Sequence, residues 1–68
     1  EAGAPPNAAD TRGVTPLHAC AMHALQGPVR LLLARGAKRD ARDSHNRTPA
    51  DVARILGFVD VAHELRPG

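Results

Sequence analysis

The sequence predicts an all-α fold in which helix-turn-helix units repeat along the chain and are joined by extended turns. A Thr-Pro pair occurs twice, at Thr15-Pro16 and Thr48-Pro49, with an offset of 33 residues. Hydrophobic residues make up 43% of the 68 residues but aromatic residues only 1%. The core must therefore be built from aliphatic side chains, which suits closely packed helices better than a sheet sandwich. Six glycines and six prolines divide the chain into short segments.

The same offset relates further positions, which indicates an internal repeat. Identical residues recur in the pairs Gly3-Ala4 and Gly36-Ala37, Ala8 and Ala41, Asp10 and Asp43, and Leu32 and Leu65. Gly13 aligns with Asn46, and both residue types tolerate the left-handed backbone of a tight turn. We therefore expect the turns around these two residues to share one conformation.

The first unit is predicted to contain two helices. Thr15 is an N-cap, since its hydroxyl can accept a free N–H of the first turn, and Pro16 suits the first helical position. This helix is expected to run from Pro16 to Ala24, with Leu17, Cys20 and Ala21 on one side, and the segment 25–27 to break it. Pro28 is expected to start the second helix, and Gly36 to end it.

The second unit repeats this order after a turn at 37–47, which has no helical periodicity. Thr48 and Pro49 start a helix that Gly57 is expected to end. The last helix is expected at 58–66, with Val61, Ala62 and Leu65 facing inward and Pro67 preventing continuation.

These motifs resemble those of the ankyrin repeat, which has a period of about 33 residues and a T-P-L-H-x-A signature. The chain reads Thr15-Pro16-Leu17-His18-Ala19-Cys20, where the final cysteine is small and packs as a hydrophobic residue. "VRLLLARGAK" resembles the end of the family's unit, and "GAPPNAAD" the tail of a preceding one. The resemblance implies a solenoid whose helix-turn-helix units are joined by β-hairpin-like turns. It assigns motif roles to Thr15, Pro16, Leu17, His18, Gly36, Thr48 and Pro49.

The resemblance divides the chain into the tail of a preceding repeat at 1–9, one repeat at 10–42, and a C-terminal capping repeat at 43–68. Neighbouring units must stack to bury their apolar faces, and arrays usually need three or more. We therefore interpret the chain as a piece of a longer array. The capping role is inferred from polar residues where an interior unit would be apolar, namely Asp51, Arg54, His63, Glu64 and Arg66.

Catalysis and metal binding find little support. His18, Cys20 and His23 share one short helix, but only Cys20 and His23 have a spacing that suits zinc ligands on one face. A catalytic cysteine needs an exposed, electropositive setting, whereas Cys20 is expected in the core. No paired acids, phosphate-binding glycine loop or serine-hydrolase motif is present. The chain is thus expected to be no enzyme, to use no cofactor or metal, and to have no small-molecule substrate.

Charge and cysteine usage limit the partners and the compartment. The net charge is +2 and the pI about 9.5, well below the charge density of a nucleic-acid-binding arm, and no aromatic side chains accompany the basic ones for base stacking. Between residues 35 and 47, a basic stretch is either a solvated turn with local ion pairs or a positively charged surface that attracts an acidic protein segment, phosphate or nucleic acid. The apolar runs are too short to cross a bilayer. A lone cysteine favours a reducing compartment, the cytoplasm or the nucleus.

Family members bind other proteins through turn tips and the concave face of the first helices, and the resemblance transfers this role to the matching positions here. The predicted partner-binding residues are Thr11, Arg12, Val14, Met22, His23, Arg35, Arg42, Ser44, His45 and Arg47. Ile55 and Leu56 match the same helix face, and for them contact with a partner and a place in the core remain alternatives.

The main functional expectation is a protein-interaction module that is part of a larger intracellular scaffold or regulator. A narrower alternative follows from residues 40–66, which resemble the last unit of the ankyrin-type inhibitors of cyclin-dependent kinases. A structural end cap without its own partner is a third reading. Self-association through an exposed repeat flank is a further alternative, because two units leave one apolar flank uncovered.

Overall fold

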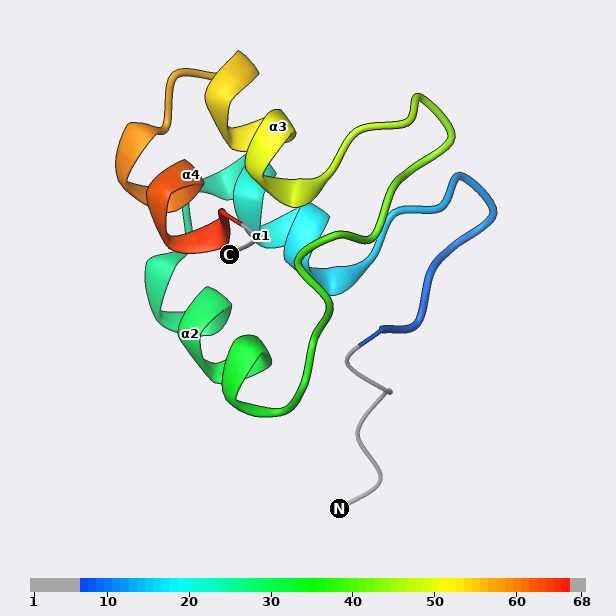
Figure 1. Cartoon of the computed structure of the whole chain (residues 1–68), viewed down its shortest axis with the longest axis horizontal. Coiled ribbons are helices and arrows are strands. Elements are labelled where there is room, and N and C mark those ends of the chain that lie inside the picture. The colour runs from blue at the N-terminus through cyan, green and yellow to red at the C-terminus, as the bar shows by residue number, and fades with distance from the viewer. Residues whose placement is uncertain (1–6, 67–68) are drawn as a thin grey trace.

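The computed structural model describes residues 7–66, which form four helices and no strand. These are α1 (Pro16–His23), α2 (Gln26–Ala34), α3 (Pro49–Ile55) and α4 (Val59–Leu65) (Figure 1). Residues 1–6 of the expected preceding tail and the expected helix stop at Pro67 lie outside the described residues. The predicted all-α fold of two helix-turn-helix units is confirmed.

Both Thr-Pro pairs start a helix as predicted, and each helix start has a reciprocal cap. Thr15 Oγ1 accepts the N–H of His18 at 3.4 Å, and His18 Nδ1 accepts the N–H of Thr15 at 3.2 Å. In the second unit, Thr48 Oγ1 accepts the N–H of Asp51 at 3.2 Å, and Asp51 Oδ2 accepts the N–H of Thr48 at 3.3 Å. Two N–H groups without intrahelical partners are thus satisfied at each start.

The ends of the helices also repeat. Gly36 has a φ of 90°, its N–H donates to Leu33 O at 3.1 Å, and the next N–H, of Ala37, donates to Leu32 O at 3.0 Å. This pair of bonds closes the last turn of α2, and it needs the left-handed backbone that glycine adopts without strain. Ala24 occupies the corresponding position after α1 with a φ of 55°, although it carries a side chain.

The predicted start of α2 at Pro28 is wrong, because the helix begins two residues earlier at Gln26. The prediction that the segment 25–27 breaks the helical structure therefore fails for its last two residues. Pro28 is the third residue of the helix. At this position the N–H of any residue would find no carbonyl four residues earlier within the helix, so the missing N–H of proline has no effect on the helical hydrogen bonds. A proline in this first turn consequently loses no helical hydrogen bond and does not mark the helix start.

The helices pack as two stacked pairs: α1 contacts α2 and α3, and α4 contacts α2 and α3 (Figure 1). The core between them is aliphatic, as expected. It consists of Leu17, Cys20, Ala21, Val29, Ala37, Ala50, Val52, Ala53, Val61, Ala62 and Leu65, with Leu32, Leu33 and Phe58 packed against it. One ion pair joins the second helices of the two units, between Arg30 Nε and Glu64 Oε1 at 3.0 Å.

Candidate interaction surface

The two turns that precede α1 and α3 have the same hydrogen-bond pattern. In the first, Asp10 Oδ1 accepts the N–H groups of Arg12 at 2.8 Å and Val14 at 3.0 Å. In the second, Asp43 Oδ1 accepts the N–H groups two and four residues later at 2.9 and 3.0 Å. Each aspartate thus holds its own turn closed. Its side-chain oxygen takes the place that a backbone carbonyl has in an ordinary turn, as in an Asx-turn. We call these turns the first tip (10–14) and the second tip (43–47).

The tips pack side by side and project from the helical layer (Figure 1). The N–H of Ser44 donates to Arg12 O at 2.8 Å, which joins the two tips directly. Gly13 has a φ of 75° and Asn46 one of 60°, so the predicted left-handed conformation is confirmed at both positions. A Cβ atom on Gly13 would lie 3.0 Å from Asp43 Cα, which is tighter than most contacts that Cβ atoms make in proteins. Glycine therefore permits both the turn and the close approach of its neighbour.

His18 connects α1 with the second tip. Its Nε2 lies 2.7 Å from Arg47 O, and its side chain is almost fully buried. A carbonyl oxygen only accepts, so Nε2 carries the proton, and Nδ1 accepts from Thr15, whose Oγ1 lies 2.8 Å away. The imidazole thereby spans from the first helix cap to the next unit, 29 residues along the chain. Both ring nitrogens are engaged, which leaves neither for a metal ion.

The aspartates of the tips are held ionised by the groups around them. The N–H groups of Val14 and Arg12 lower the pKa of Asp10 below its ordinary value of 3.8. Burial alone would raise the pKa of Asp43, but the N–H groups of Arg47 and His45 and the Arg47 guanidinium outweigh burial and lower that pKa. The Arg47 guanidinium Nε lies 3.2 Å from Asp43 Oδ2. The same carboxylate therefore closes the turn and fixes an arginine side chain beside it.

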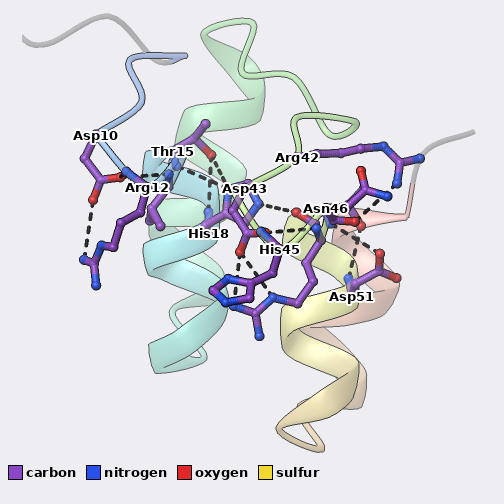
Figure 2. Close-up of polar contacts among 12 residues, drawn as sticks. Asp10, Arg12, Thr15, His18, Arg42, Asp43, His45, Asn46 and Asp51 are labelled. Atoms are coloured by element: carbon purple, nitrogen blue, oxygen red, sulfur yellow. Dashed lines mark hydrogen bonds and ion pairs between the residues drawn. The ribbon is translucent and has the colours of Figure 1, made fainter.

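A hollow of about 120 Å³ lies where the tips meet α1 and α3, and Figure 2 shows several of its polar residues together. Six predicted partner-binding residues line it, namely Arg12, Val14, Met22, Ser44, His45 and Arg47. His18, Asp43 and Val52 line it as well, and they were missing from the prediction. The repeat offset could have identified Asp43, because Asp10 and Asp43 are the strongest turn formers at matching positions.

Four predicted partner-binding residues lie outside the hollow. Thr11 is exposed on the first tip, and His23 is exposed at the last turn of α1. Arg35 caps the end of α2, and Arg42 lines a separate groove beside α3 and α4. The hollow therefore unites residues from the tips and the middle of α1, whereas the outlying basic residues face elsewhere.

The apolar residues predicted for the concave face are exposed. Met22 is 42% exposed, Leu56 49% and Ile55 66%. The alternative that Ile55 and Leu56 belong to the core is therefore wrong. Ile55 lies in a shallow depression with Arg47 and Asp51, so an apolar side chain adjoins the polar second tip. Such mixed surfaces, with an aliphatic residue among fixed polar groups, are typical of interaction sites.

The remaining candidate groups have structural surroundings. Cys20 is in the core as predicted, and burial raises the pKa of its thiol, which makes it a poor nucleophile. Within residues 7–66, histidine, cysteine and acidic side chains do not gather in threes as a metal site requires. The helices in this described part are too short to cross a membrane.

Comparison with known proteins agrees with this architecture. The family model for the ankyrin repeat matches residues 12–44. The chain is 42% identical to cyclin-dependent kinase inhibitor 2A of Homo sapiens over 65 residues, which are 94% of the chain and 42% of that protein. It is 40% identical to cyclin-dependent kinase 4 inhibitor B of Homo sapiens, over 94% of the chain and 47% of the relative.

A relative of a different kind, SH3 and multiple ankyrin repeat domains protein 2 of Homo sapiens, is 33% identical over 94% of the chain and 4% of its own length. The chain thus spans less than half the length of each of these relatives. The matched signature, the stacked helix pairs and the repeated tips agree with one another. The chain belongs to the ankyrin-repeat family, whose repeats are protein-interaction modules.

Proposed function

We propose that the chain binds a partner protein through the surface formed by the two tips and the adjoining faces of α1 and α3. The observation that carries this proposal is the hollow in which six residues from two units meet. Their backbone is fixed before binding by the two aspartates and by the Ser44 N–H bond to Arg12 O. A surface that is already ordered loses little conformational entropy when a partner binds.

The chemistry of the hollow indicates the contacts that a partner makes. Met22 and Val14 offer apolar area, while Arg12 and His45 offer hydrogen-bond donors at the edge. Arg47 has its guanidinium engaged by Asp43, so it presents a charge of fixed position. A partner segment with one apolar side chain flanked by carboxylates or carbonyl oxygens fits this arrangement.

The test is quantitative affinity capture with a double variant, Met22→Ala with His45→Ala. Neither side chain makes a hydrogen bond within the described residues, so the variant removes contact area and leaves the tips intact. The matched control is Leu31→Ala with Arg39→Ala, which removes one exposed apolar and one exposed polar side chain from outside the hollow. We expect recovery of a partner to fall with the first variant alone. Equal recovery of every captured protein with all three chains would refute the proposal.

A second candidate is kinase inhibition, favoured by the 42% and 40% identities to the two cyclin-dependent kinase inhibitors over nearly the whole chain. Since one relative is by name an inhibitor of cyclin-dependent kinase 4, this kinase is the probe. We expect the chain to bind it in calorimetry and the Met22→Ala, His45→Ala variant to bind more weakly than the control variant. Absence of binding at stoichiometric excess excludes this candidate and leaves the more general one in place.

The chain's role within a longer array remains a proposal as well. Asp51, Arg54, His63 and Arg66 all line the groove beside α3 and α4, which supports a polar end face. Glu64, the other residue of this prediction, instead pairs with Arg30 of α2.

A further inference from the structure

A second and larger concavity lies beside α3 and α4 of the second helix pair. It has a volume of about 720 Å³ and is lined by residues of α3 and α4, of the segment before α3, and by Arg66 at the end of α4, with none from α1 or α2. We call it the C-terminal groove. The residues that carry the argument are Arg42, Asp51, Arg54, Val59, Ala62 and Arg66.

The groove is electropositive. Three guanidinium groups line it against a single carboxylate, that of Asp51. That carboxylate is already used, because Asp51 Oδ2 accepts the N–H of Thr48 and Oδ1 lies 3.8 Å from Arg54. Arg42 donates to Asn46 O at 3.4 Å, a neutral acceptor. The excess positive charge therefore faces solvent in a concave site, where it attracts anionic groups.

The floor and one rim of the groove are aliphatic. Ala62 is buried and forms part of the floor, while Val59 is 73% exposed on α4. An occupant that matches both features has carboxylates for the three arginines and at least one aliphatic side chain for the surface around Val59. An acidic peptide segment with interspersed leucine or isoleucine has this composition.

Other occupants fit less well. A further repeat would place apolar helices over the groove and bury three arginine charges that share a single carboxylate, which is unfavourable. Single-stranded nucleic acid supplies negative charge, but it depends on aromatic side chains for base stacking, and the groove lining contains no Phe, Tyr or Trp. The combination of three arginines that share one carboxylate and an exposed valine favours a peptide.

We propose that the C-terminal groove binds an acidic peptide segment that carries aliphatic residues, independently of the surface at the tips. The two sites share α3 but no lining residue: the hollow at the tips also involves α1, whereas the groove also involves α4. The chain can therefore hold two segments at once, either from one partner or from two.

The probe is a fluorescein-labelled peptide with a repeated Glu-Glu-Leu unit, measured against the 68-residue chain by fluorescence anisotropy. The groove variant is Arg54→Glu with Arg66→Glu. The control is Arg35→Glu with Arg39→Glu, which changes the net charge equally at exposed positions outside the groove. We expect the groove variant to weaken binding at least about tenfold and the control less than about threefold, since only the former reverses direct charge contacts. Binding should also weaken as salt increases.

Further measurements distinguish the acidic peptide from other occupants of the groove. A Gln-Gln-Leu peptide should not bind, and an oligothymidylate should compete weakly. Amide NMR shifts on addition of the acidic peptide should change at Arg54 and Ala62 and not at Met22. Circular dichroism of both variants checks that they remain folded, and the neutral pair Arg54→Gln with Arg66→Gln replaces the charge reversal if they do not.

Four results would overturn the proposal: no binding of the acidic peptide at low salt, equal weakening by the control variant, shifts confined to the tips, or stronger binding of the oligothymidylate. A concentration-dependent dimer that the groove variant abolishes would also overturn it, because the occupant would then be a second copy of the chain. The tip surface is tested by other residues, so failure here leaves the proposed function untouched.

Discussion

Replacing Gly13 by alanine tests whether the close contact between the two tips stabilises the fold. Two costs combine at this position. The φ of 75° requires a left-handed backbone, which costs a residue with a Cβ about 1–2 kcal/mol. The added Cβ would also lie 3.0 Å from Asp43 Cα and 3.2 Å from Ser44 N. These are backbone atoms that cannot rotate away, so the tips must separate, at a further cost of about 1–3 kcal/mol.

Gly57 provides the matched control. Its φ is 83°, but a Cβ there would meet nothing within 4 Å. Gly57→Ala therefore carries the backbone cost alone, reduced by about 0.4–1 kcal/mol through the lower entropy of the unfolded chain. Gly13→Ala receives the same reduction. The difference between the two variants isolates the contact between the tips.

The assay is urea unfolding followed by far-ultraviolet circular dichroism, because the chain has no tryptophan or tyrosine to report by fluorescence. Domains of this size have a slope of about 1 kcal/mol per molar urea. We therefore expect the unfolding midpoint of Gly13→Ala to lie about 1 M or more below that of Gly57→Ala. Equal midpoints for the two variants would refute the claim that the tips are packed against each other.

Three further predictions concern the caps and the buried polar groups. Ala24→Gly should raise the melting temperature by a few degrees, because Ala24 has a φ of 55° and glycine removes that strain; an unchanged or lower value would contradict it. The free energy of unfolding should fall as the pH drops below 3.8, since the pKa of Asp43 is lower in the folded than in the unfolded chain. The ionised Asp43 stabilises the fold fully only above the pKa that it has in the unfolded chain. Asp43→Asn should flatten this dependence in acid titrations of stability, and an unaltered slope would contradict the assignment. His18→Ala should lower the free energy of unfolding by about 3 kcal/mol, because it removes one of the two donors to Arg47 O, leaves the Thr15 N–H without its acceptor and creates a cavity; a urea midpoint within error of the original would be inconsistent with it.

The parts of the fold that depend on local chemistry could be predicted from the sequence. The Thr-Pro pairs start α1 and α3, and Gly36 ends α2. In each case the hydrogen bonds involved join residues at most five positions apart in the sequence. The offset of 33 residues added the equivalence of Gly13 and Asn46, and hence the common shape of the tips. These features follow from backbone sterics and from N–H groups that need partners.

The parts that depend on contacts between units could not be predicted in the same way. The start of α2 was misplaced because a proline is equally compatible with several positions in a first turn. The exposure of Ile55 depends on which neighbouring elements cover α3, and its own apolar character carries no information on this. The hollow exists only because Arg12 and Ser44 are brought together from two units.

Hydrogen exchange of the tip amides, measured by NMR, tests the central claim that the two units stack in register and preorganise one surface. The N–H of Ser44 is the most informative, because it bonds to Arg12 O in the other unit, 2.8 Å away. We expect this exposed residue to exchange far more slowly than an unstructured peptide, together with the N–H groups that donate to Asp10 and Asp43. Exchange of the Ser44 amide at the unstructured rate, while the helices remain protected, would contradict the claim.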